Sequence, residues 1–144
     1  MQRVINARVG PEGAELRVFA SPSGWSLDEL RSNKRPFPQP RSLRAVIDTG
    51  ATITIIREGI AASLDMKPVN VLPISFPTDK DGKPALFRQY SIQLVLPNNV
   101  VLPQIRAAEM PMTHYAIDCL IGRDVLRQGV FIYNGPLDAF TLCL

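Results

Sequence analysis

The most informative segment of the sequence is Ala45-Val46-Ile47-Asp48-Thr49-Gly50-Ala51-Thr52. An apolar run typical of a buried strand ends at the carboxylate of Asp48, which is an unfavourable place for a charge. Gly50 permits the close backbone approach that a tight active-site turn needs, and the Thr49 hydroxyl can hydrogen-bond neighbouring backbone. Aspartate and glycine are also common turn formers, so the bare tripeptide favours an ordinary turn after a strand.

A second motif, about seventy residues further on, changes this interpretation. It reads Cys119-Leu120-Ile121-Gly122-Arg123-Asp124-Val125-Leu126, in which Gly-Arg-Asp follows two apolar residues and precedes a predicted short helix. Together with residues 45–52 it resembles the paired signatures of retropepsin-like aspartic peptidases, and residues 133–142 resemble that family's closing hairpin. The resemblance covers residues 43–144. It implies a mainly β fold, a closed acid-protease barrel with one or two short helices, in which the Asp48 strand lies beside residues 120–122.

The resemblance also implies a peptidase mechanism that needs two carboxylates. One takes a proton from the attacking water while the other donates to the scissile carbonyl oxygen, and their closeness keeps both from ionising at once. The chain has a single Asp-Thr-Gly, and Asp118 and Asp124 belong to the second motif. The second catalytic aspartate would therefore come from another copy of the chain across a two-fold axis. The length of 144 residues agrees, because a two-lobed enzyme would need roughly twice as much chain. We expect a homodimer that acts on polypeptides.

Individual roles follow from the matching positions. Asp48 is the expected catalytic carboxylate, the Thr49 hydroxyl would join the two active-site loops across the dimer, and the Gly50 N–H would hydrogen-bond the carboxylate. Ala51 and Thr52 are expected to line the cleft beside the substrate backbone.

A hairpin between predicted strands 69–76 and 85–96 is the candidate flap, closing over a peptide bound in extended form. An ordinary hairpin is the alternative, since its tip has fewer glycines than many flaps of the family. The tip residues expected to contact substrate are Asp79, Lys80, Asp81 and Gly82.

Gly122, Arg123 and Asp124 are expected to be structural. In well-known members of the family the arginine pairs with an acid shortly after Asp-Thr/Ser-Gly, but here that position is Thr52. Arg123 would then bond Asp124, a backbone carbonyl or a residue across the dimer.

The composition excludes several other chemistries. The single histidine, His114, and the two cysteines, Cys119 and Cys143, are fewer than the roughly four ligands of a Cys/His zinc site. No metal or cofactor is therefore expected; His114 is assigned to a surface loop and the cysteines to packing, with Cys119 in the core. Apolar residues make up 46% of the chain, which indicates a folded core, and thirteen prolines favour short strands and loops.

The chain shows no sign of a membrane or secretory address. It contains no apolar run of 18 residues, and Met1–Val9 lacks the apolar stretch of a signal peptide. We expect no membrane contact and, by default, a cytoplasmic protein.

The pattern along the chain predicts one domain over 1–144. A hairpin over 1–20 is followed by a proline-rich basic loop over 21–42, with one helical turn at 27–30, and by the peptidase core over 43–144. Short helices are expected within 58–66 and 123–128. The other strands are expected at 52–55, 100–110, 117–121, 130–133 and 140–144.

Three functions stay open at this point: an active homodimeric endopeptidase, a dimeric peptide-binding or assembly module that cleaves weakly or not at all, and a basic β-domain that binds nucleic acid. The intact Asp48-Thr49-Gly50 favours the first, although a fold alone does not establish activity. A net charge of +3 spread over the chain makes nucleic acid an unlikely partner. The basic side chains that the third function would use are Arg31, Lys34, Arg35, Arg41 and Arg44.

Overall fold

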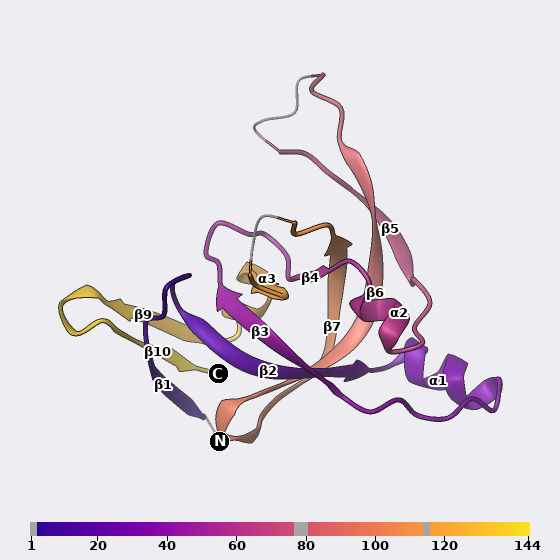
Figure 1. The fold of residues 1–144 in the computed structure, drawn as a ribbon, viewed down its shortest axis with the longest axis horizontal. Coiled ribbons are helices and arrows are strands. Elements are labelled where there is room, and N and C mark those ends of the chain that lie inside the picture. Colours follow the sequence, from indigo (N-terminus) through magenta and orange to yellow (C-terminus); the bar gives the residue numbers. More distant parts are fainter. Residues whose placement is uncertain (1–2, 77–80, 114–115) are drawn as a thin grey trace.

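A computed structural model describes residues 3–76, 81–113 and 116–144 of the chain. Within them the protein is mainly β, as the sequence predicts (Figure 1). The elements are β1 (Val4–Arg8), β2 (Glu15–Pro22), α1 (Trp25–Ser32), β3 (Arg41–Ile47), β4 (Ile55–Arg57), α2 (Ile60–Ser63), β5 (Asn70–Ile74), β6 (Ala85–Leu96), a 3₁₀ turn (Pro97–Asn99), β7 (Val100–Met110), β8 (Cys119–Ile121), α3 (Arg123–Leu126), β9 (Val130–Asn134), a 3₁₀ turn (Gly135–Leu137) and β10 (Ala139–Cys143).

Six strands close into a barrel in the order β2-β3-β8-β4-β7-β6, because β6 pairs in turn with β2. One edge of the long strand β6 is shared: residues 92–95 pair with β2 and residues 85–89 pair with β5. The β3–β8 and β4–β7 pairs are parallel, and the other pairs are antiparallel. Because the sheet closes on itself, each of these six strands pairs with a neighbour on both sides. This confirms the closed β fold expected from the sequence.

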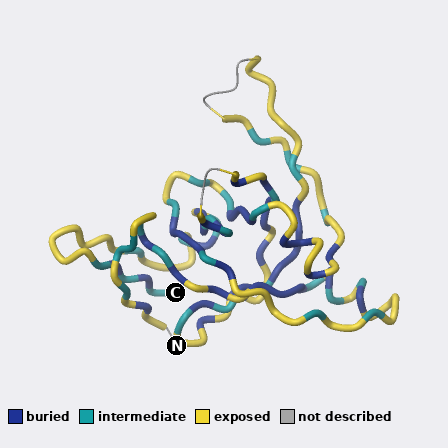
Figure 2. Tube along the Cα trace, in the orientation of Figure 1, coloured by how far each residue is buried: buried dark blue, intermediate teal, exposed yellow. Residues whose placement is uncertain are grey.

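The core fills the barrel through the alternation of side chains along its strands. In β2, Leu16, Val18 and Ala20 are buried while Arg17 and Phe19 between them are exposed. Figure 2 shows the buried residues concentrated in the middle of the barrel, with exposed chain along the β5–β6 hairpin.

The prediction of a hairpin over residues 1–20 is wrong. Both of its strands exist, but β1 pairs with β10, which pairs with β9 in a separate three-stranded sheet. Pairing with β10 places Ile5 beside Leu142, and both are buried. The two edges of β2 are taken by β3 and β6, so the turn at 10–13 redirects the chain without joining β1 to β2.

Two other expected elements differ in extent. The stretch 21–42, expected to be mostly loop, holds the eight-residue helix α1 as well as the ends of β2 and β3. The strand expected at 52–55 begins only at Ile55, because the preceding residues bend toward α3. By contrast, β6 and β7 have the predicted bounds. None of the helices that the structure describes is long and apolar enough to cross a membrane.

Candidate active site

Asp48 lies where β3 ends beside β8. The two strands run parallel, with Ile47 opposite Ile121, and the Asp48 N–H donates to the Ile121 carbonyl at 2.9 Å. The chain then turns, so that the Gly50 N–H donates to Asp48 Oδ1 at 2.8 Å and the Ala51 N–H to the Asp48 carbonyl at 3.2 Å. The carboxylate is thus half-buried and held at a fixed place on a tight turn.

Thr54 joins this turn to the second motif. Its hydroxyl donates to Asp124 Oδ1 at 2.8 Å and accepts the Gly122 N–H at 3.2 Å, while its own N–H donates to Asp124 Oδ2 at 3.0 Å. The Thr54 residue has no exposed surface. A Cβ on Gly122 would lie 2.5 Å from main-chain atoms of Ile53, so only glycine allows the two segments to cross this closely. Thr54 was not among the site residues predicted from the sequence, although a polar residue inside a predicted strand was a usable signal.

Arg123 takes one of the arrangements expected from the sequence, a bond to a backbone carbonyl. Its Nη1 donates to the Thr49 carbonyl at 3.1 Å, and its Nη2 donates to Thr52 Oγ1 at 3.2 Å. The neighbouring carboxylate of Asp124 is directed to Thr54 and to the Val125 N–H instead. Arg123 therefore holds the turn that follows Asp48 at two points through neutral acceptors.

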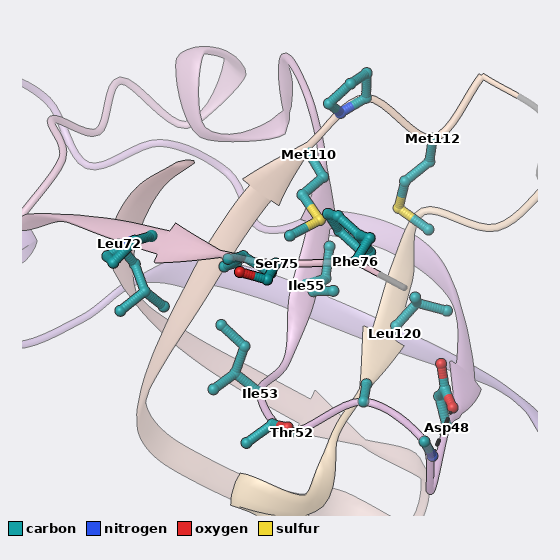
Figure 3. Close-up of a pocket in the computed structure, with 15 residues that line it drawn as sticks. Asp48, Thr52, Ile53, Ile55, Leu72, Ser75, Phe76, Met110, Met112 and Leu120 are labelled. Carbon is teal, nitrogen blue, oxygen red and sulfur yellow. Dashed lines mark hydrogen bonds between the residues drawn. The ribbon is translucent and has the colours of Figure 1, made fainter. Parts of the chain in front are cut away.

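A cavity of about 750 Å³ opens beside Asp48 (Figure 3). This volume is typical of a ligand site. Ala51 and Thr52 line the cavity, and among its described lining residues Asp48 is the only charged one. Much of the remaining wall is apolar and was not predicted from the sequence, where these residues read as ordinary strand positions. It includes Leu72 and Phe76 around β5, Met110 and Met112 at the end of β7, and Leu120 of β8.

The β5–β6 hairpin contributes its β5 side to this cavity. Residues 72–76 line it, and Phe76 packs edge-to-face on Phe87 with ring centroids 6.2 Å apart. The hairpin then extends beyond the barrel (Figure 1). Asp81 and Gly82 are exposed and lie outside the cavity lining. Two other expected flap residues, Asp79 and Lys80, lie outside the described residues, as does His114.

Arg57 holds the segment that follows β7. Its Nη1 donates to the Met112 carbonyl at 2.7 Å, its Nη2 donates to the Ile117 carbonyl, and its Nε lies 3.3 Å from Asp118 Oδ1. Met112 and Ile117 are almost fully buried. The segment after β7, which contributes Met112 to the cavity wall, is thereby fixed to β4.

The remaining reactive groups offer little alternative chemistry. Cys119 is fully buried, as expected, and burial raises the pKa of its thiol to about 12. Among the described residues, no group of three or more His, Cys, Asp or Glu side chains is placed to hold a metal ion. Of the basic side chains considered for nucleic acid, Arg35 pairs with Glu29 and Asp65, and Arg44 pairs with Glu15. These pairs reduce the charge that a nucleic acid would meet there.

Comparison with known proteins identifies the family and the fold of the chain. The fold is similar to a retropepsin-like aspartic protease from Rickettsia conorii, with a TM-score of 0.63 and 14% sequence identity over 99% of this chain and 92% of that one. A second similar structure is the retroviral protease-like domain of Ddi1 from Leishmania major, with a TM-score of 0.44 and 14% identity over 90% of this chain and 88% of that one. No curated protein matches the chain. Residues 39–128, which include both motifs, match the family described as gag-polyprotein putative aspartyl protease. The chain belongs to this aspartyl protease family and has its retropepsin-like fold.

Proposed function

We propose that this protein is an aspartic endopeptidase whose active site forms when two copies bring their Asp48 carboxylates together. The observation that carries the proposal is the place of Asp48: it is the only charged residue among the described lining residues of a mostly apolar cavity of about 750 Å³. A tight, hydrogen-bonded turn fixes the carboxylate there. Catalysis by acid and base requires this kind of preorganised position.

The chemistry follows from sharing one proton between two carboxylates. The Gly50 N–H donates to Oδ1 of Asp48 and holds the carboxylate in place, and two carboxylates held close together do not both ionise. The pair therefore holds one proton, so that the ionised member takes a proton from water and the protonated member donates to the carbonyl oxygen of the scissile bond. The hydroxide left from the water bonds to the scissile carbon and forms a gem-diol. When the C–N bond breaks, the leaving nitrogen takes a proton from the pair and a hydroxyl of the gem-diol returns one to it, so that a carboxylic acid, an amine and the singly protonated pair remain.

A homodimer is part of the proposal because the chain carries a single Asp-Thr-Gly. Thr49 and Gly50 are exposed beside Asp48, so this turn is free to meet the same turn of a second copy. A polypeptide in extended form is the substrate that an elongated apolar cleft between two such copies would take. Ala51 and Thr52 would lie along its backbone, and the β5–β6 hairpin would cover it.

The test compares the wild type with Asp48→Asn on a mixed peptide library between pH 4 and 7, together with the mass of the protein in solution. Asp138→Asn is the matched control, since Asp138 is an exposed residue of the β9–β10 turn with a positive φ that asparagine tolerates. We expect cleavage by the wild type and the control only, and a dimer in all three. Cleavage that survives Asp48→Asn would refute the mechanism. An inert wild type that still binds peptides would replace it with the peptide-binding module.

A further inference from the structure

The guanidinium of Arg123 lies next to the turn that follows Asp48. It offers five N–H donors, of which two are used, both on neutral oxygens: the Thr49 carbonyl and Thr52 Oγ1. In the described part of the chain Arg123 has no ion pair, whereas Arg35 has two and Arg44 and Arg57 have one each. The residue is exposed, so donors remain for a further acceptor.

Its position brings this charge to the edge of the cavity. Nη2 lies 3.2 Å from the hydroxyl of Thr52, and Thr52 is an exposed residue of the cavity wall (Figure 3). Because that hydroxyl accepts a hydrogen bond from Arg123, its own proton is left to donate to a ligand. At Thr52 the cavity wall thus presents a hydroxyl donor with the Arg123 guanidinium next to it, while much of the rest of the wall is apolar.

We propose that Arg123 and Thr52 form a carboxylate-binding subsite of the peptide cleft, so that the protein selects peptides with a glutamate or aspartate at the position beside Thr52. A guanidinium and a carboxylate form charge-assisted hydrogen bonds, often two in parallel, which an amide side chain of the same size cannot match. The inference rests on the proposed peptide cleft. The same chemistry could be supplied by the free C-terminus of a peptide, and the experiment separates the two sources.

The measurement uses the Asp48→Asn protein, so that binding is read without cleavage. Fluorescently labelled peptides, blocked at both ends, carry glutamate or glutamine at each position in turn, and their dissociation constants are measured by fluorescence anisotropy. For a partly exposed ion pair we expect glutamate to bind about fivefold more tightly than glutamine at one position. The ratio should shrink toward one when the salt concentration is raised from low ionic strength to 0.5 M. A parallel peptide with a free C-terminus ending at that position shows whether a terminal carboxylate does the same.

Two variants test the assignment to these residues. Arg123→Gln should abolish the glutamate preference. Thr52→Asp leaves Arg123 in place but gives it a carboxylate of its own, so it too should abolish the preference even if Arg123→Gln fails to fold. Asn134→Asp, the same change of charge on the exposed strand β9, should leave the preference unchanged.

The proposal is overturned if no position distinguishes glutamate from glutamine, if neither peptide binds, or if the preference survives Thr52→Asp. The first result would also follow if a carboxylate of a second copy already occupies Arg123. Failure of the subsite is distinguishable from failure of the proposed function. Cleavage by the wild type without a glutamate preference removes only the subsite, and selective binding without cleavage removes only the peptidase.

Discussion

Replacing Thr54 by valine would remove a single hydroxyl from the junction between the turn that follows Asp48 and the second motif. Valine has nearly the same shape, so the packing around this fully buried residue should be kept. The lost contacts are the donation to Asp124 Oδ1 at 2.8 Å and the acceptance of the Gly122 N–H at 3.2 Å. The bond from the Thr54 main-chain N–H to the other oxygen of Asp124 would remain.

The size of the effect can be estimated from these two contacts. A hydrogen bond to a charged group contributes about 1.5–3 kcal/mol, and a buried N–H left without an acceptor costs about 1–3 kcal/mol. Because the two contacts share one hydroxyl they are not fully additive, and we expect the free energy of unfolding to fall by about 3 kcal/mol. For a chain of this size that corresponds to a fall in Tm of about 10 °C.

Urea unfolding and thermal melts at a fixed protein concentration measure this change, since dimer formation makes Tm depend on concentration. The matched control is Thr141→Val, which removes a hydroxyl that donates to Asn6 Oδ1 at 2.7 Å on the exposed side of β10. It should change the stability by no more than about 0.5 kcal/mol. If both substitutions cost the same, the reasoning that gives the buried Thr54 hydroxyl its importance is refuted.

Three other expectations follow from single residues. Gly122→Ala should destabilise the fold by more than about 2 kcal/mol in urea unfolding, because the added methyl group meets main-chain atoms; a cost below 0.5 kcal/mol would show that the crossing can relax. A thiol reagent at pH 8 should modify Cys143 but not Cys119 in the folded protein, because burial raises the pKa of the Cys119 thiol to about 12; two reactive thiols before unfolding would contradict this. The hydrogen bond from Lys67 lowers the pKa of Glu29, so this carboxylate stabilises the fold above pH 4.5, and the stability is lost as pH falls through the lowered value. Glu29→Gln should therefore lower the urea midpoint at pH 7, and an equal loss at pH 3 would refute the linkage.

The two motifs predicted the barrel and the place of Asp48 because each combines a local pattern with a long-range consequence. The family resemblance that the two motifs carry implied that the Asp-Thr-Gly strand and the Gly-Arg-Asp segment lie side by side, and β3 and β8 do so in parallel register. Local turn chemistry was a poorer guide to pairing. The turn at 10–13 suggested a hairpin, yet β1 pairs with β10 at the other end of the chain. Phe140 and Leu142 of β10 are buried in that arrangement.

The apolar wall of the cavity could not be read from the sequence, for a different reason. Met110, Met112 and Leu72 belong to strands or their ends, where an apolar residue is equally suited to the core. Which of them line the space beside Asp48 depends on how β5, β7 and β8 lie around it, and that is long-range structure. The sequence likewise left several hydrogen-bond acceptors possible for Arg123. In the structure the turn places the Thr49 carbonyl and the Thr52 hydroxyl beside its guanidinium.

Mixing subunits shows whether one active site is built from two copies of the chain. Wild-type protein at a fixed amount is equilibrated with increasing Asp48→Asn protein, well above the concentration needed for dimers, and peptide cleavage is measured. If both Asp48 carboxylates are required, random pairing makes the activity per wild-type chain proportional to the wild-type fraction: about one half in an equal mixture and about one tenth with a ninefold excess. Activity that stays unchanged at every ratio would contradict the shared site and show that one copy acts alone.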